Sequence, residues 1–239
     1  MLEVDDKVIV ALDCGEDEAL RLADALAGHA GWVKVGMTLY YACGPAIVSA
    51  MRERCLKVFL DLKLHDIPHQ IRGAAQAAAT AGADLISVHA LGGADMMAAA
   101  REGVEAAAAA TGRERAHIVG ITILTSHDAA SVASLGITDP IPSEVRRLAL
   151  LACGSGADGI VCSPQEAADM RAALGEKPLI VTPGVRPAGA DIGDQSRIAT
   201  PASAIQAGAS MLVVGRPITQ ADDPTAAFDA ISAQVRGAN

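Results

Sequence analysis

The sequence predicts an α/β protein, a (βα)8 TIM barrel of eight parallel strands that forms a single domain over residues 1–239. The first observation is the length of 239 residues, because barrels of this type commonly run to about 250 residues as one unit. The second is the alternation of short apolar runs with alanine-rich stretches of helical spacing. The third is a repeated glycine that stands between the end of a helix and the next strand.

Eight runs rich in apolar and β-branched residues are the predicted strands. They are residues 8–13, 32–37, 57–62, 84–89, 117–124, 158–162, 179–183 and 210–215. Strands that alternate with helices form a parallel sheet with right-handed crossovers, and eight such units predict closure into a barrel. An open, doubly wound sheet is the alternative.

A local repeat supports this alternation of helix and strand. Three segments carry it: AGADLISV (81–88), SGADGIVC (155–162) and AGASMLVV (207–214). We expect Gly82, Gly156 and Gly208 to adopt the left-handed conformation that follows the last turn of a helix.

Composition and charge exclude several classes of protein. A content of 51% hydrophobic and 20% charged residues is typical of globular chains. The net charge of -9 and the five aromatic residues argue against nucleic acid as a partner, because such surfaces are normally basic and often use aromatic side chains for stacking.

The sequence also bears on membranes and on the compartment. No apolar stretch reaches the roughly 20 residues of a membrane helix, and no basic segment precedes the first apolar run, so we expect neither membrane insertion nor a secretory signal. The five cysteines are odd in number and form no C-x-x-C pair. This pattern predicts buried thiols in a reducing compartment, the cytoplasm.

The segment LDLKLHDIP (60–68) places charged residues inside an apolar run. On a regular strand Asp61 and Lys63 share one face, and the leucines between and beside them point the other way. An exposed ion pair is one explanation. A site in the barrel lumen is the better one, because the strands of an all-parallel sheet are covered on both faces.

Asp66 follows Lys63 by an odd step, so a straight strand would direct it away from the other two. Because Pro68 allows the chain to leave the strand, Asp66 either curls back into its own site or completes the site of a neighbouring barrel. Nearby carboxylates hold Lys63 as an ammonium ion, which argues against Schiff-base chemistry. A charged lysine suits the stabilisation of developing negative charge and the delivery of a proton to it.

These residues resemble the D-x-K-x-x-D-I-P signature of the orotidine 5′-phosphate decarboxylase family. The other matching stretches are VALD (10–13), VKVGM (33–37), VHALGG (88–93), LTS (124–126), VTPGVR (181–186), DQSRIATP (194–201) and VVGRPIT (213–219). The resemblance implies conversion of orotidine 5′-phosphate to uridine 5′-phosphate and carbon dioxide, in pyrimidine biosynthesis, with no metal and no organic cofactor. It also implies a homodimer in which Asp66 and Ile67 complete the neighbouring site.

The resemblance also assigns roles to single residues. Lys63 would protonate C6 of the pyrimidine within a charged network that includes Asp61 and Asp66. The implied substrate-binding residues are Asp13 and Lys34 at the ribose, Ile67 across the dimer interface, Thr125 at the pyrimidine, Pro183, Arg186 and Gln195 in a closing loop, and Gly215 and Arg216 at the phosphate. Ser126 competes with Thr125 for its role.

Two rival functions and two single residues remain open from the sequence. The signature alone is shared with magnesium-dependent decarboxylases and aldolases of sugar phosphates, but Lys34 stands where those barrels place an acidic metal ligand. A non-catalytic barrel that binds nucleotides is a rival of another class. For His89 we expect a structural hydrogen bond, and Gln70 stands where the family usually has threonine.

Overall fold

Eight parallel strands alternate with helices and close into a barrel in the computed structural model, which describes residues 6–186 and 199–238. The strands are β1 (Val8–Leu12), β2 (Trp32–Gly36), β3 (Lys57–Leu64), β4 (Leu85–His89), β5 (His117–Ile121), β6 (Gly159–Val161), β7 (Leu179–Pro183) and β8 (Met211–Val214). They follow one another in chain order around the barrel, and β8 pairs with β1. The predicted fold class is confirmed.

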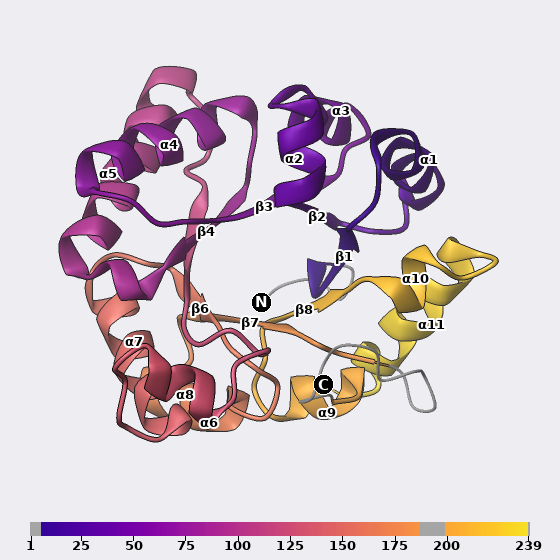
Figure 1. Cartoon of the computed structure of the whole chain (residues 1–239). Helices are drawn as coiled ribbons and strands as arrows, with labels where there is room; N and C mark the ends of the chain where they lie inside the picture. The colour runs from indigo at the N-terminus through magenta and orange to yellow at the C-terminus, as the bar shows by residue number, and fades with distance from the viewer. Residues whose placement is uncertain (1–5, 187–198, 239) are drawn as a thin grey trace.

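The helices form a ring around the strands, and the first helices of the chain meet the last ones where the barrel closes (Figure 1). Those between β1 and β5 are α1 (Glu16–Leu26), α2 (Met37–Cys43), α3 (Ala46–Glu53), α4 (Pro68–Ala81), the 3-10 helix η2 (Ala90–Gly92) and α5 (Ala94–Thr111). Those that follow β5 are α6 (Ala129–Ser134), α7 (Ile141–Gly154), α8 (Ala167–Leu174), α9 (Pro201–Gln206), α10 (Arg216–Thr219) and α11 (Pro224–Arg236). Among the described residues, no helix has the length and apolar content required to cross a membrane.

Two hydrophobic clusters follow from the two-residue period of the strands. On β1, Ile9 and Ala11 belong to a cluster inside the barrel, whereas Val8, Val10 and Leu12 pack against the helices outside. The inner cluster also contains Trp32, Phe59, Leu85, Val119, Val181, Met211 and Val213. The barrel is therefore filled by side chains over most of its height, and polar groups collect at its carboxyl end.

Strand β5 is shorter than the apolar run that predicts it, residues 117–124. It ends at Ile121, and the next residue, Thr122, donates both its N–H and its hydroxyl to the carbonyl of Val161, at 3.3 and 2.8 Å. Because the hydroxyl competes for the same acceptor, the chain turns there and the last residues of the run line a cavity instead of extending the sheet.

The three glycines of the repeat lie in the left-handed region, as predicted. Their φ angles are +114° at Gly82, +102° at Gly156 and +96° at Gly208. At Gly208 a Cβ atom would lie 2.9 Å from the side chain of Arg171, so space as well as φ requires glycine there.

The residue two positions after each of these glycines makes a further, recurring contact. The carboxylates of Asp84 and Asp158 accept the backbone N–H groups of Val58 and Ile118 at 2.8 Å, and the Ser210 hydroxyl accepts that of Ile180 at 3.0 Å. Each acceptor precedes an even-numbered strand, and each donor lies in the strand before it. The repeat thus ties neighbouring strands together at the amino end of the barrel.

Of these three acceptors, Asp158 is also surrounded by basic side chains. Its carboxylate accepts two hydrogen bonds from the Arg115 guanidinium, at 2.6 and 2.8 Å, and faces His117 at 3.7 Å. Burial alone would raise the pKa of Asp158, but His117, Arg115 and the Ile118 N–H favour the charged form and hold the pKa well below its usual range.

We predict that Asp158→Asn lowers the free energy of unfolding by about 2 kcal/mol near neutral pH, because hydrogen bonds to a charged group are lost. A depressed pKa stabilises the folded state above the ordinary carboxyl pKa of about 3.9, and this contribution declines as the pH falls below it. The gap between wild type and variant should therefore narrow at about pH 3. Urea titrations at both pH values measure the free energy of unfolding of wild type and variant. Asp169→Asn, on the exposed face of α8, is the control. Equal stability of wild type and Asp158→Asn at neutral pH would contradict the prediction.

Candidate active site

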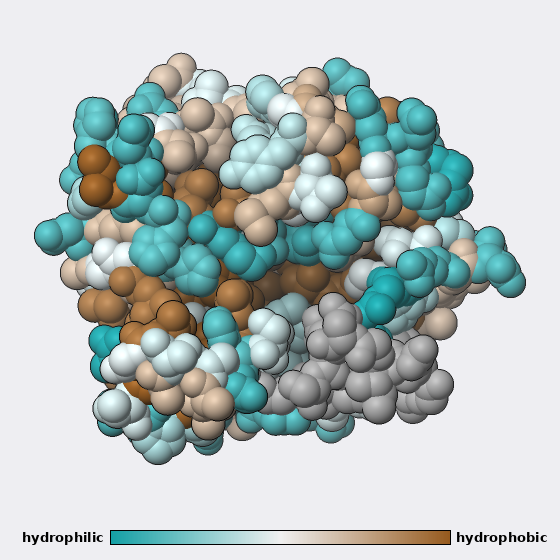
Figure 2. Space-filling view, in the orientation of Figure 1, coloured by the Kyte–Doolittle hydropathy of each residue, from teal (hydrophilic) through white to brown (hydrophobic). Residues whose placement is uncertain are grey.

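Two adjoining cavities open at the carboxyl ends of the strands. In the space-filling view a cleft crosses the middle of this face, with hydrophobic residues at its floor and a band of hydrophilic residues along its upper edge (Figure 2). The first cavity has a volume of about 220 Å³ and the second about 550 Å³. Both are lined by Lys34, Pro183 and Val213, so they are neighbouring parts of one site.

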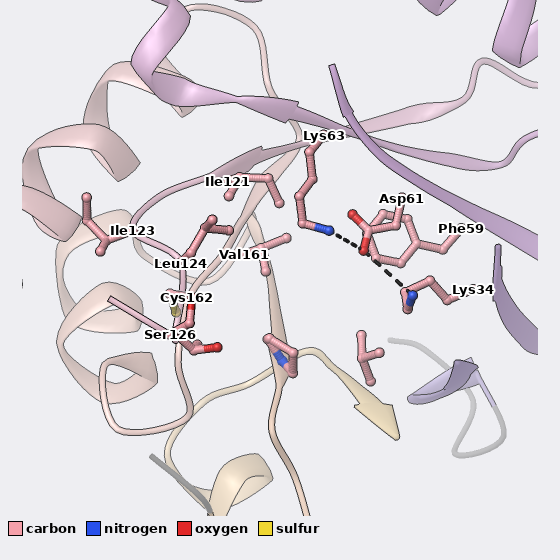
Figure 3. Close-up of a pocket in the computed structure, with 13 residues that line it drawn as sticks. Lys34, Phe59, Asp61, Lys63, Ile121, Ile123, Leu124, Ser126, Val161 and Cys162 are labelled. Carbon is pink, nitrogen blue, oxygen red and sulfur yellow. Dashed lines mark hydrogen bonds and ion pairs between the residues drawn. The ribbon is translucent and has the colours of Figure 1, made fainter. Parts of the chain in front are cut away.

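The Asp61 carboxylate lies at the centre of a charged network. Its side chain belongs to β3, is only 11% exposed and accepts a hydrogen bond from Nζ of Lys63 at 2.8 Å. Nζ of Lys34 lies 3.8 Å from the same oxygen, Oδ2 (Figure 3). Removing a carboxylate from water is costly, and the two ammonium groups offset that cost. The predicted pairing of Asp61 with Lys63 in the lumen is confirmed.

The backbone of β3 around Lys63 is irregular, whereas the prediction assumed a regular strand. Lys63 has a φ of +52°, and the register of β3 against β4 shifts between the pairs Leu60↔Ile86 and Leu64↔Val88. Three residues of β3 therefore face a single residue of β4, which defines an irregular bulge. The bulge, not simple alternation, directs the Lys63 side chain into the cavity.

Ser87, the β4 residue opposite this bulge, was not among the predicted site residues. It is fully buried, donates its hydroxyl to Oδ1 of Asp61 at 2.8 Å and accepts the N–H of Lys63 at 2.9 Å. A polar residue inside the apolar run of β4 is a signal that could have identified it.

Lys34 links the network to the mouth of the barrel. Its Nζ donates to Oδ1 of Asp13 at 2.8 Å, and its side chain is buried, whereas that of Asp13 is 66% exposed. Lys34, which the resemblance places at the ribose, thus lies in the lumen beside Asp61. The four groups Asp13, Lys34, Asp61 and Lys63 form a row of alternating charge with no net charge of its own.

The first cavity is mainly apolar on the side that faces Lys63. The Lys63 side chain extends between Asp61 on one side and Ile121 and Val161 on the other (Figure 3). The remaining apolar lining residues are Phe59, Ile123, Leu124, Cys162 and Val213. Thr125 and Ser126 both reach this cavity, so the choice between them stays open.

The second cavity is more polar and contains two arginines. It is lined by Asp13, Arg186, Gly215 and Arg216, four of the predicted binding residues. Gly215 follows β8 and Arg216 begins α10, while Arg186 follows β7 and is buried. Cys14 and Glu18 also line it and were not predicted. Two guanidinium groups at the ends of adjacent strands suit a multiply charged anion.

The predicted closing loop, residues 183–201, is described only at its two ends. There Val185 forms a parallel bridge with Ala199, and the N–H of Arg186 donates to the carbonyl of Ala199 at 2.9 Å. The segment therefore leaves and returns at one point beside the second cavity. Gln195 lies outside the described residues.

Two predicted residues lie outside the cavities. Asp66 is exposed, and its carboxylate accepts the N–H of Ile67 at 2.7 Å. Ile67 is 63% exposed. Of the two alternatives for Asp66, the described residues do not show the one in which it curls back into its own barrel.

His89, at the end of β4, does not make the expected hydrogen bond through Nδ1. That atom is buried and has no hydrogen-bonding partner among the described residues. The ring lies 5.5 Å from that of His65. Burial first, then the neighbouring His65 and Lys63, lower the pKa of His89 to about 4. The imidazole is therefore neutral around neutral pH.

The two cavities differ in the chemistry that their side chains can perform. An ammonium group held beside a buried carboxylate, next to apolar walls, can stabilise a carbanion and protonate it. The arginine-lined half can hold an anionic group at a distance from the reaction. Fold and site together define a (βα)8 barrel with a network of lysines and carboxylates beside a cavity that suits a small anionic substrate.

Comparison with known proteins gives the family. The model of the orotidine 5′-phosphate decarboxylase / HUMPS family matches residues 6–231. An orotidine 5′-phosphate decarboxylase of Anaeromyxobacter sp. (strain K) is 49% identical over 229 residues, which cover 95% of this chain and 97% of that protein. One of Moorella thermoacetica is 48% identical over 232 residues, covering 96% and 92%. The crystal structure of the decarboxylase from Lactobacillus acidophilus is 38% identical, with a TM-score of 0.87, and covers 96% of this chain and 99% of that one. The chain belongs to the orotidine 5′-phosphate decarboxylase / HUMPS family.

We predict that the His89 ring titrates with a midpoint near pH 4. A histidine pKa below its ordinary value of about 6.5 means that the unfolded chain binds the proton more readily, so His89 destabilises the folded state increasingly as the pH falls from about 6.5 toward 4. Histidine NMR signals followed against pH give the midpoint, with His89→Gln to assign the resonance. A midpoint close to that of an unperturbed histidine would contradict the described burial.

Proposed function

We propose that the protein converts orotidine 5′-phosphate to uridine 5′-phosphate and carbon dioxide, and that Lys63 donates the proton to C6 of the pyrimidine without help from a metal ion. The observation that carries the proposal is the buried Asp61–Lys63 pair, with 2.8 Å between Nζ and Oδ2, beside an apolar cavity. The names of the relatives supply the substrate, and the geometry supports the chemistry.

The difficult step is the loss of the carboxylate, which leaves an electron pair at C6. Breaking the bond between C6 and the carboxylate carbon releases carbon dioxide, and a proton from Nζ of Lys63 forms the new C6–H bond. Asp61 repels a substrate carboxylate placed beside it, and this repulsion disappears as neutral carbon dioxide leaves. Lys63, by contrast, gains attraction as negative charge develops at C6, so its contribution is largest in the transition state.

The two cavities support a division of the substrate between them. The apolar half beside Lys63 suits the pyrimidine, with Thr125 or Ser126 as hydrogen-bonding group and Pro183 at the rim. Asp13 and Lys34, at the junction, suit the ribose hydroxyls. The phosphate is assigned to Gly215, Arg216 and Arg186 in the second half, with Gln195 proposed to complete the closing loop.

We propose a homodimer in which Asp66 and Ile67 complete the site of the partner subunit. Asp66 is exposed next to the exposed Ile67, so its carboxylate is free to enter the site of another chain. Four large apolar residues are exposed after the consecutive strands β2, β3 and β4: Met37, Tyr41, Ile67 and Leu91. Exposed apolar groups of this kind are typical of interfaces.

The state of the cysteines bears on the compartment in which the protein works. All five of them, Cys14, Cys43, Cys55, Cys153 and Cys162, are free thiols. Free thiols support a reducing compartment, and we propose the cytoplasm. Fractionation of the source cells would test this.

The first experiment follows the ultraviolet absorbance of orotidine 5′-phosphate with purified protein pretreated with EDTA. Conversion to uridine 5′-phosphate at a rate far above that of the protein-free control would establish substrate and metal independence together. If instead the protein released carbon dioxide only from a keto-sugar phosphate, and only with magnesium, the proposed function would be wrong.

For Lys63 we predict that Lys63→Ala lowers kcat by roughly a thousandfold or more, because both the proton donor and the stabilising charge are lost. Lys177→Ala, an exposed lysine ahead of β7, is the matched control and should keep wild-type kcat. Circular dichroism confirms that both variants are folded. Substantial turnover by Lys63→Ala would remove Lys63 from the proposed role.

The partner contribution of Asp66 is tested by mixing two inactive variants. If Asp66 serves the neighbouring barrel, a heterodimer of Lys63→Ala and Asp66→Asn contains one site with both native residues. Random assortment then restores about a quarter of wild-type activity, since half of the dimers are mixed and each has one intact site. Coexpression followed by the same assay measures it. Activity no greater than that of the separate variants would place Asp66 in its own barrel.

A further inference from the structure

We propose that Ser87 is a positioning residue for this reaction, which orients both Asp61 and Lys63 through a single hydroxyl group. The inference rests on the proposed function, because it concerns the same site. It adds a residue outside the charged network to the groups on which turnover depends.

The Ser87 hydroxyl makes one hydrogen bond to Asp61 and one to Lys63. Its one hydrogen is donated to Oδ1 of Asp61 at 2.8 Å, and its oxygen accepts the backbone N–H of Lys63 at 2.9 Å. The side chain has 0% exposure, so no bulk water can take over either contact.

The position of Ser87 in the sheet explains why a side chain is needed there. Between the pairs Leu60↔Ile86 and Leu64↔Val88, Ser87 is the one residue of β4 that faces the bulge of β3. The bulge interrupts the regular ladder of backbone hydrogen bonds. The Ser87 hydroxyl takes the place of a ladder acceptor for the Lys63 N–H, which lies in a half-buried part of the sheet.

This contact also holds an unfavourable backbone conformation. Lys63 has a φ of +52°, in the left-handed region that residues with a Cβ rarely adopt. Without an acceptor at Ser87, Lys63 would lose a contact that holds this conformation and aims its Nζ at the cavity. Asp61 is held at both oxygens, since Oδ2 meets Lys63 and Oδ1 meets Ser87. Its carboxylate therefore cannot rotate freely when substrate binds.

The test compares Ser87→Ala with Ser210→Ala. Ser210 is the matched control, because its hydroxyl also accepts a backbone N–H from the preceding strand, that of Ile180 at 3.0 Å, but at the opposite end of the barrel. We expect Ser87→Ala to lower kcat by roughly tenfold to a hundredfold, as for a lost hydrogen bond to a charged group, with a much smaller change in KM. Ser210→Ala should keep wild-type kcat.

A second variant and a second measurement complete the design. Ser87→Cys nearly preserves the shape but has a weak hydrogen-bonding group, so it should lower kcat in the same direction if Ser87→Ala does not fold. Crystal structures of the Ser87 variants without ligand should show a longer distance between Nζ of Lys63 and Oδ2 of Asp61, or a Lys63 φ outside the left-handed region.

The outcomes separate this inference from the proposed function. Equal loss of kcat in the Ser87 and Ser210 variants, a change confined to KM, or an unaltered Lys63–Asp61 geometry would overturn the role of Ser87. If the wild-type protein does not convert orotidine 5′-phosphate, the proposed function fails, whereas the crystal structures still decide whether Ser87 positions the pair.

Discussion

A buried carboxylate between two ammonium groups is the interaction on which the rest of this structure depends. Asp61 is removed from solvent at the top of a hydrophobic barrel, where an isolated charge would be strongly unfavourable. Lys63 and Lys34 balance that charge, and Asp13 in turn balances Lys34. Such a row of charges needs rigid walls, because each distance must hold while substrate enters and product leaves.

The barrel provides these walls through its two clusters of apolar side chains. Below the charged network the lumen is filled by packed apolar side chains such as Ile9, Phe59 and Met211, which form its rigid floor. At that end, the contacts of Asp84, Asp158 and Ser210 tie strand to strand. Stability and chemistry therefore lie at opposite ends of the same strands.

The bulge in β3 shows where the fold accepts a local cost for the site. A regular strand would cost less backbone energy than the bulge, but Lys63 would then not adopt the left-handed conformation seen here. The left-handed residue brings Nζ to Asp61, and the buried hydroxyl of Ser87 satisfies the backbone group that the bulge exposes. Strain at a reactive residue, supported by its neighbours, is typical of functional sites.

Sequence alone determined the architecture and most of the charged network. The alternation of apolar and alanine-rich segments, with glycines such as Gly82 at the ends of helices, predicted the barrel, because periodicity and glycine conformations are local properties. The signature at Asp61 and Lys63 predicted the pair, and the family resemblance identified Lys34 as a further site residue.

Only the tertiary structure decided how these groups meet. The bulge at Lys63 arises from the register between β3 and β4, which no property of β3 by itself specifies. The pairing of Ser87 with Asp61 joins residues on neighbouring strands, and the orphaned Nδ1 of His89 depends on what packs around it. Local patterns determine which elements form, whereas distances between side chains on different elements depend on how those elements pack.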